Sequence, residues 1–105
     1  MKGKYSKLIL EHCNKENVDI PPGFKRYPAS HLAVIRLDGE QPKLVAKTFF
    51  KKEDLKYYIL TNLLGLTVDS DGNLPAMVID LKEHKSFVIA ENGHLIQNVI
   101  TRQSR

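Results

Sequence analysis

The chain has 105 residues and a mass of 12.0 kDa, which suffices for one domain and is too little for a multidomain enzyme. Hydrophobic residues make up 42% and charged residues 27%, so the composition excludes a disordered chain and a collagen-like fibre. The net charge of +4 suits an acidic partner without requiring one. We expect a single domain over residues 1–105, with residues 1–3 and 103–105 as flexible ends.

The cysteine and the amino-terminal segment bear on the compartment. The single cysteine, Cys13, cannot form a disulfide within the chain, which is typical of a reducing compartment. The first residues are basic, but only the apolar run 8–10 follows before Glu11. A signal peptide needs about 7 to 15 apolar residues and a membrane-spanning helix about 20. We therefore expect a cytoplasmic protein without a membrane partner.

The first expected element is a short amphipathic helix over residues 4–16. Its apolar residues recur at helical spacing, and they are Tyr5, Leu8, Ile9 and Cys13. Pro21, Pro22 and Gly23 prevent the helix from continuing. An irregular crossover is expected to follow.

Two strands are expected next, over residues 31–38 and 43–50. The first is apolar and β-branched at nearly every position, and the second alternates Lys43, Val45, Lys47 and Phe49 with Leu44, Ala46, Thr48 and Phe50. Gly39 and Pro42 lie between them, so the two strands are expected to pair as a hairpin.

A second helix is expected over residues 51–64. One stripe of its surface carries Leu55, Tyr58, Ile59, Asn62 and Leu63. Gly65 stands where a left-handed helix cap belongs.

The remainder of the chain has the pattern of β-strands, at residues 66–69, 76–82, 86–91 and 94–102. The first of these could be only an extended lead-in. Asn92 and Gly93 between two apolar runs predict a hairpin with a type I′ turn, because both residues tolerate positive φ angles.

These elements predict an α+β fold: an antiparallel, meandering sheet of four to five strands with two helices on one face, in the order α-β-β-α-β-β-β(-β). The other face is also apolar, so the first helix, a curled sheet or a second copy of the chain has to cover it. We favour a homodimer. The residues expected at its interface are Met77, Ile79, Phe87, Ile89, Ile96 and Ile100.

The basic residues are concentrated in the first part of the chain. Residues 1–65 carry a net charge of +5 and residues 66–105 a net charge of −1. A surface for nucleic acid or an acidic protein is predicted from Lys25, Arg26, Arg36, Lys43, Lys47, Lys51, Lys52, Lys56 and Tyr57, with Tyr27 nearby as a second stacking ring. The alternative is that these lysines only solvate a sheet edge and a helix.

Sites for metals, cofactors and catalysis are not indicated. The segment 69–73 has oxygen ligands at calcium-loop spacing, but Leu74 stands where the glycine of such a loop belongs, so a β-turn is the better interpretation. His12, His31, His84 and His94 do not form a zinc-binding spacing. Cys13 is expected to be a small buried hydrophobe. No metal, cofactor or catalytic residue is predicted.

Three functions remain open on the sequence alone. The favoured one is a non-enzymatic interaction or regulatory module that acts as a homodimer. The second is a nucleic-acid-binding accessory protein that uses the basic surface. The third is a ligand-binding domain or enzyme with a pocket between sheet and helices, lined by residues such as Tyr58, Phe87 and His94.

Overall fold

The computed structural model describes residues 4–24 and 29–98. That part of the chain folds into two helices and one five-stranded sheet, which confirms the α+β class and the expected order of elements. The elements are α1 (Lys4–Glu16), β1 (Leu32–Arg36), β2 (Lys43–Phe49), α2 (Lys52–Asn62), β3 (Asn73–Asp80), β4 (Lys85–Ala90) and β5 (Leu95–Gln97).

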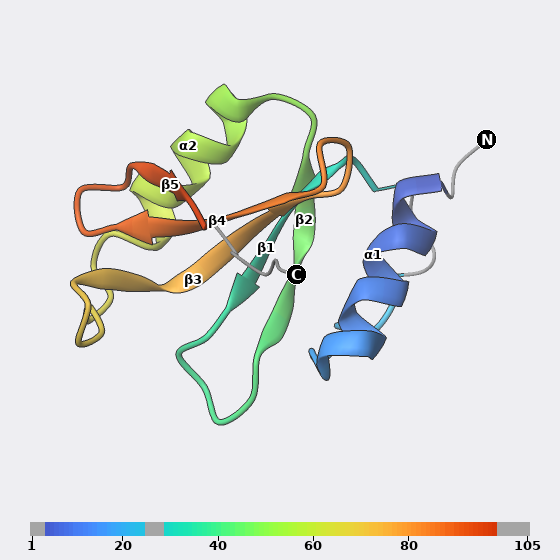
Figure 1. The fold of residues 1–105 in the computed structure, drawn as a ribbon, viewed down its shortest axis with the longest axis horizontal. Coiled ribbons are helices and arrows are strands. Elements are labelled where there is room, and N and C mark those ends of the chain that lie inside the picture. The colour runs from blue at the N-terminus through green and yellow to red at the C-terminus, as the bar shows by residue number, and fades with distance from the viewer. Residues whose placement is uncertain (1–3, 25–28, 99–105) are drawn as a thin grey trace, which may run out of the picture.

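All neighbouring strands of the sheet are antiparallel, in the order β2-β1-β3-β4-β5 (Figure 1). The interior strand β1 pairs with β2 through a hairpin and with β3 after the chain has passed through α2. The four residues 32–35 of β1 are all buried. A strand that is covered on both faces is apolar at every position, which explains the continuous apolar run in the sequence.

One face of the sheet packs against α2. The helix contributes Leu55, Ile59 and Leu63 to a core with alternate residues of the strands. These strand residues are Leu32, Val34, Phe49, Leu74, Ala76, Val78, Phe87 and Ile89. The stripe predicted on the second helix is therefore its buried side.

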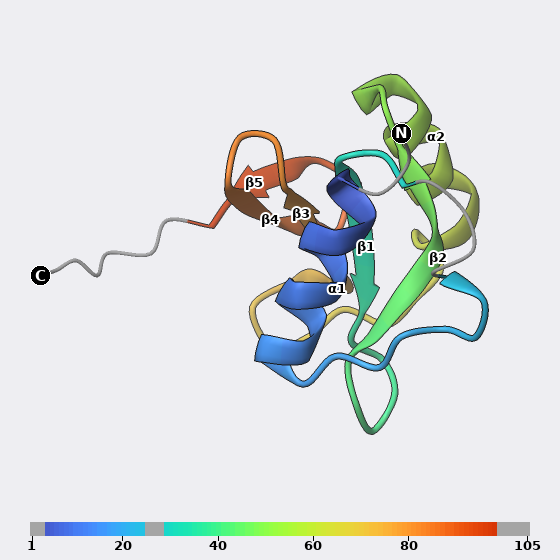
Figure 2. The same cartoon turned by 90° about the vertical axis from the view of Figure 1, so that its right-hand side faces the viewer.

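The opposite face of the sheet packs against α1 (Figure 2). Ile9 and Cys13 of the helix contact a second core that includes Ala33, Ile35 and Leu44, the strand residues that alternate with those of the first core. The expectation that both helices share one face is wrong. Both faces of the sheet are apolar, so each has to be shielded from water. The helix α2 shields one face, and α1 shields part of the other.

The second helix ends without the expected glycine cap. The cap residue is Leu63, whose backbone N–H donates to the carbonyl of Ile59, and the N–H of Leu66 donates to the carbonyl of Leu63. Positive φ angles among the described glycines occur at Gly23, Gly72 and Gly93, so Gly65 is not in the left-handed region.

The loop from Gly65 to β3 contains a side-chain-stabilised turn in place of the expected strand over residues 66–69. Oδ1 of Asp69 accepts hydrogen bonds from the backbone N–H of Asp71 at 2.9 Å and of Asn73 at 3.0 Å. The segment is therefore a β-turn and not a calcium-binding loop, as the sequence analysis predicted. It places the start of β3 at Asn73.

The β3–β4 turn is closed by a buried carboxylate. Asp80 is 4% exposed, and its Oδ1 accepts hydrogen bonds from the N–H groups of Lys82 and Glu83, both at 3.0 Å. His84 completes the turn with a φ of 57°. These bonds turn the chain directly after Asp80, so β3 ends two residues earlier than the sequence predicts.

The β4–β5 turn differs from the expected type I′ geometry. Gly93 has a φ of 92°, whereas Asn92 is not among the residues with positive φ. The N–H of Ala90 donates to the carbonyl of His94, and that of Gly93 donates to Ala90. Residues 91–93 thus form a three-residue loop that ends in a left-handed glycine.

We expect Gly93→Ala to lower the free energy of unfolding by about 1 to 2 kcal/mol, because an L-residue with this φ is strained. An added Cβ would lie 3.5 Å from Cδ2 of Leu64, an ordinary contact, so the loss comes from the backbone. Urea denaturation followed by circular dichroism measures it. Gly65→Ala is the matched control, since its Cβ would meet open space. An equal loss in both variants would contradict the assignment.

Neither helix in the described ranges has the length and apolar character needed to cross a membrane.

Candidate functional site

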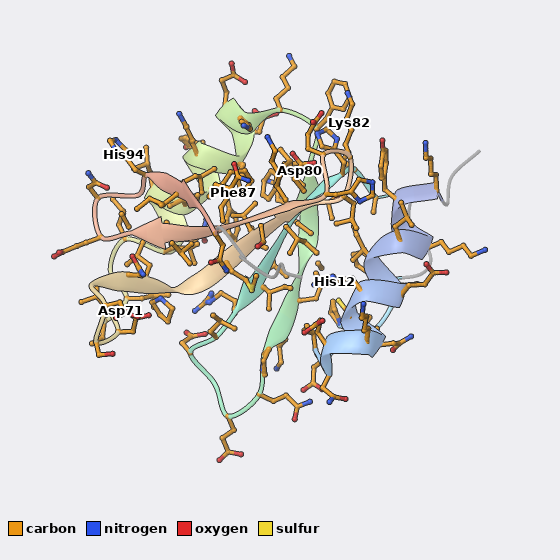
Figure 3. All side chains as sticks on the ribbon, in the orientation of Figure 1. His12, Asp71, Asp80, Lys82, Phe87 and His94 are labelled. Carbon is orange, nitrogen blue, oxygen red and sulfur yellow. The ribbon has the colours of Figure 1, made fainter. Side chains whose placement is uncertain are left out.

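A groove lies between α1 and the part of the sheet that the helix leaves uncovered. It has a volume of about 280 Å³. We call it the α1 groove, and it is lined by His12, Glu16, Val18, Ile35, Leu37, Pro42, Met77, Ser86 and Asn98. His12 and Glu16 are one helical turn apart and form one wall. Figure 3 shows His12 on the side of α1 that faces the sheet.

A second hollow of about 270 Å³ adjoins the α1 groove toward the β3–β4 turn. The two share His12 and Ser86, so they form one continuous depression along α1. The second hollow is the more polar, because Asp80, His84 and Lys85 line it.

Cys13 lies behind the wall of the α1 groove. Helical spacing places Ser6, Ile9 and Cys13 on one side of α1, and all three are buried. Ile9 and Cys13 share a core with residues of the sheet. Cys13 is 0% exposed. Burial raises the pKa of its thiol to about 11, because the thiolate loses its hydration in the apolar core. The folded protein therefore holds Cys13 as a neutral thiol at physiological pH, as expected for a small buried hydrophobe.

The predicted basic residues are spread along the length of β2. Arg36 and Lys43 face each other across β1 and β2 at one end of these strands. Lys51 and Lys52 stand at the other end, where α2 begins, and Lys56 lies on α2. Phe49 lies six positions after Lys43 along β2, a distance of roughly 20 Å. The described basic residues thus form an extended band along β2.

Several of these cations already have partners in the fold. Nε of Arg36 donates to Oδ1 of Asp38 at 3.1 Å. This hydrogen bond raises the pKa of Arg36 and lowers that of Asp38. The Nζ atoms of Lys47 and Lys52 lie 5.6 Å and 5.5 Å from the ring centroids of Phe49 and Phe87. Their stems therefore cover core rings, which agrees with the solvation alternative.

The remaining residues of the basic surface are only partly placed. Tyr57 is 70% exposed on the outer side of α2. Lys25, Arg26 and Tyr27 lie outside the described residues. Binding of nucleic acid or an acidic protein by this surface stays a prediction.

The residues predicted for a dimer interface lie on two opposite faces of the sheet. Met77, Ile79 and Ile96 are on the α1 side, whereas Phe87 and Ile89 belong to the core under α2. Ile89 is 0% exposed and Phe87 8%, so one flat interface does not contain both groups. Ile100 lies outside the described residues, and self-association stays a prediction.

The three residues expected to line a pocket do not come together. Phe87 is in the core, Tyr58 is half-buried with its ring 5.4 Å from that of Phe49, and His94 is exposed at the β4–β5 turn. Figure 3 shows Phe87 near the middle of the sheet and His94 at its outer end. Within residues 4–24 and 29–98, no group of three or more His, Cys, Asp or Glu side chains is placed to hold a metal ion.

Sequence reasoning did not identify the α1 groove. The available signal was the pair His12 and Glu16, which share a flank of the first helix at i, i+4 spacing. The other walls come from several separate segments of the chain, and these segments meet only because α1 covers this face of the sheet.

Comparison with known proteins gives a distant match. Two curated relatives, both named thiol-disulfide oxidoreductase ResA, come from Bacillus thuringiensis subsp. konkukian (strain 97-27) and Bacillus cereus (strain ATCC 10987 / NRS 248). Each is 25% identical over 93 residues, which cover 89% of this chain and 50% of the relative. The chain therefore spans about half the length of these relatives. No family profile and no solved structure matches the chain.

These relatives correct the function predicted from the sequence. Their name states thiol-disulfide oxidoreduction, so the match points to thiol chemistry. The prediction of a non-enzymatic interaction or regulatory module is wrong on this finding, because both relatives are named as enzymes. The cytoplasmic location stays a prediction.

Proposed function

We propose that this protein takes part in thiol-disulfide exchange by forming a mixed disulfide between Cys13 and a cysteine-containing partner. The match of 89% of the chain to thiol-disulfide oxidoreductases carries the proposal. Cys13 is the only cysteine in these 105 residues, so exchange by this chain has to use it. A dithiol cycle within one chain needs two cysteines, so the oxidised form here is a disulfide to a second molecule.

The exchange step uses the partner's disulfide as the oxidant. The Cys13 thiol loses its proton to a base in solution, and the thiolate attacks one sulfur of the partner disulfide. A bond forms between Sγ of Cys13 and that sulfur, while the partner's own S–S bond breaks. The released partner thiolate then takes up a proton.

Access to Cys13 requires movement of α1. The thiol is fully buried and has a pKa of about 11, so the closed protein supplies very little thiolate at neutral pH. Two buried side chains of the helix, Ile9 and Cys13, pack in the core between α1 and the sheet. Local opening of a terminal element costs less free energy than global unfolding. Opening of α1 therefore sets the rate of exchange.

Reaction of the native protein with oxidised glutathione at pH 8 tests the proposal. We expect intact-mass spectrometry to show one glutathione adduct, formed while circular dichroism still reports folded protein. Ile9→Ala should accelerate the reaction by at least about tenfold, because it weakens the packing of α1.

Ile59→Ala is the matched control, since it removes the same side chain from the core under α2 and leaves α1 in place. It should leave the rate nearly unchanged. The proposal is overturned if no adduct forms on the folded protein. It also fails if the two variants accelerate the reaction equally, because Cys13 is then exposed only by global unfolding.

A further inference from the structure

The two edges of the sheet, which lie at its opposite ends in Figure 2, differ in how they are protected. At the β2 edge, the backbone N–H of Leu44 donates to the carbonyl of Asp19 at 2.8 Å, so the chain itself occupies part of this edge. Lys43 and Lys47 add charge along the same strand. Such features keep a sheet edge from pairing with another chain. The β5 edge lacks both among the described residues, since its strand, Leu95–Gln97, has no charged side chain and no further segment pairs with it.

The hydrogen bonds of β5 show which of its residues face the free edge. The backbone N–H of Asn98 donates to the carbonyl of Ser86 at 2.8 Å. Successive residues of a strand direct their backbone groups to alternate sides, so Ile96, two positions earlier, also bonds to β4. Leu95 and Gln97 therefore direct their N–H and C=O groups outward. No described residue bonds to them there.

The α1 side of the sheet is apolar up to this edge. The strand register places Met77, Val88 and Ile96 in one row across β3, β4 and β5. The core under α1 takes its strand residues from β1, β2 and β3 and none from β5. Ile96, at the end of the row, is 50% exposed. Addition of a strand at this edge would bury the end of the row and pair the outward backbone groups.

We propose that β5 pairs with β5 of a second copy of this chain, antiparallel about a two-fold axis at Ile96, so that the two five-stranded sheets become continuous. Leu95 then exchanges its outward hydrogen bonds with Gln97 of the second copy, and Gln97 with Leu95 of the second copy. The two Ile96 side chains face each other in the close, non-hydrogen-bonded position between these pairs. The occupant is a second copy because this register is self-complementary: the same three residues supply both sides.

Charge permits this pairing, and the area limits its strength. The residues brought opposite each other are uncharged, so no like charges meet. A strand of three residues buries well below the roughly 800 Å² per partner of a standard interface, so we expect a dissociation constant above about 10 μM. The contact also differs from the flat interface predicted from the sequence, because Ile96 is the one described residue of that set on β5.

Sedimentation equilibrium from about 1 μM to about 1 mM, with a reductant present, tests this dimer. We expect the mean mass to rise with concentration from 12.0 kDa toward twice that value. Over the same range, NMR should show several-fold slower solvent exchange of the amide hydrogens of Leu95 and Gln97. The amide of Ile96, which already bonds to β4, should be protected at every concentration.

Substitutions at the two-fold axis test the register. Ile96→Lys and Ile96→Asp should each lower the association constant by at least about tenfold, because like charges then face each other. An equimolar mixture of the two variants should associate more strongly than either variant alone, since each lysine then meets an aspartate. Leu60→Lys is the matched control, because Leu60 is 55% exposed on the outer side of α2. It should associate like the unchanged chain.

Three results would refute this dimer. They are a mass of 12.0 kDa at about 1 mM, association that survives Ile96→Lys, and a mixture of the charged variants that associates no better than each alone. If Leu95 and Gln97 are protected in a monomer, the chain itself covers the edge and the proposal is wrong. The reductant excludes a disulfide through Cys13 as the cause of association, so failure of the dimer and failure of thiol exchange are distinguishable.

Discussion

Ile59→Ala is expected to lower the free energy of unfolding by about 2 to 5 kcal/mol. Ile59 is 0% exposed and lies between Leu55 and Leu63 on the buried side of α2. Truncation leaves a cavity against the sheet that rigid strands refill only in part. Urea denaturation followed by far-ultraviolet circular dichroism measures the loss.

The adjacent residue provides the control for this loss. Leu60 is 55% exposed on the outer side of the same helix. Leu60→Ala should change the stability by no more than about 0.5 kcal/mol, since little apolar surface is uncovered. Similar losses at the two positions would show that α2 does not pack on the sheet through its Leu55, Ile59 and Leu63 side.

The second large effect is a fall in stability at alkaline pH that depends on Cys13. The pKa of this thiol is about 11 in the folded chain, against an ordinary value of 9.0. Between these two values the unfolded chain releases a proton that the folded chain retains, so stability falls as the pH rises. A shift of two units corresponds to about 2.7 kcal/mol. The loss is complete above pH 11, and below pH 9 this contribution is constant.

Comparison with Cys13→Ala isolates the contribution of the thiol. Lysine and tyrosine side chains also titrate in this range, and the variant retains all of them. The difference in unfolding free energy between the two proteins should therefore shrink or change sign from pH 8.5 to pH 11. A constant difference over this range would mean that Cys13 ionises as easily in the folded chain as in the unfolded one.

Local patterns in the sequence predicted most of the secondary structure. The helical spacing of Tyr5, Leu8, Ile9 and Cys13 predicted α1 with its observed bounds, because the buried side of a helix has a fixed period. The continuous apolar run 31–38 predicted β1, although its position between β2 and β3 was not evident. The sequence predictions were wrong mainly in turns whose geometry depends on a single residue. Asp80 ends β3 early through its side-chain hydrogen bonds, and Gly93 alone adopts a positive φ in the β4–β5 turn.

The candidate site was not predictable to the same extent. Cys13 was correctly interpreted as buried, since it lies on the apolar stripe of its helix. The α1 groove depends on the choice of α1 to cover one half of a sheet face, and residues as distant as Glu16, Met77 and Asn98 meet there. The spacing of residues along the chain does not predict that these distant residues line one groove.

The position of β1 has a consequence for the order of folding events. Its hairpin with β2 joins Arg36 and Lys43 through the short segment 37–42, and β3, β4 and β5 also connect through tight turns. The pairing of Arg36 with Ala76 closes the whole of residues 37–75, α2 included. Loop-closure entropy is highest for that step, so we expect β1 to meet β3 late and this encounter to limit the folding rate. Substitutions at the buried cross-strand pair Val34 and Val78 are therefore expected to change the folding rate as well as the stability.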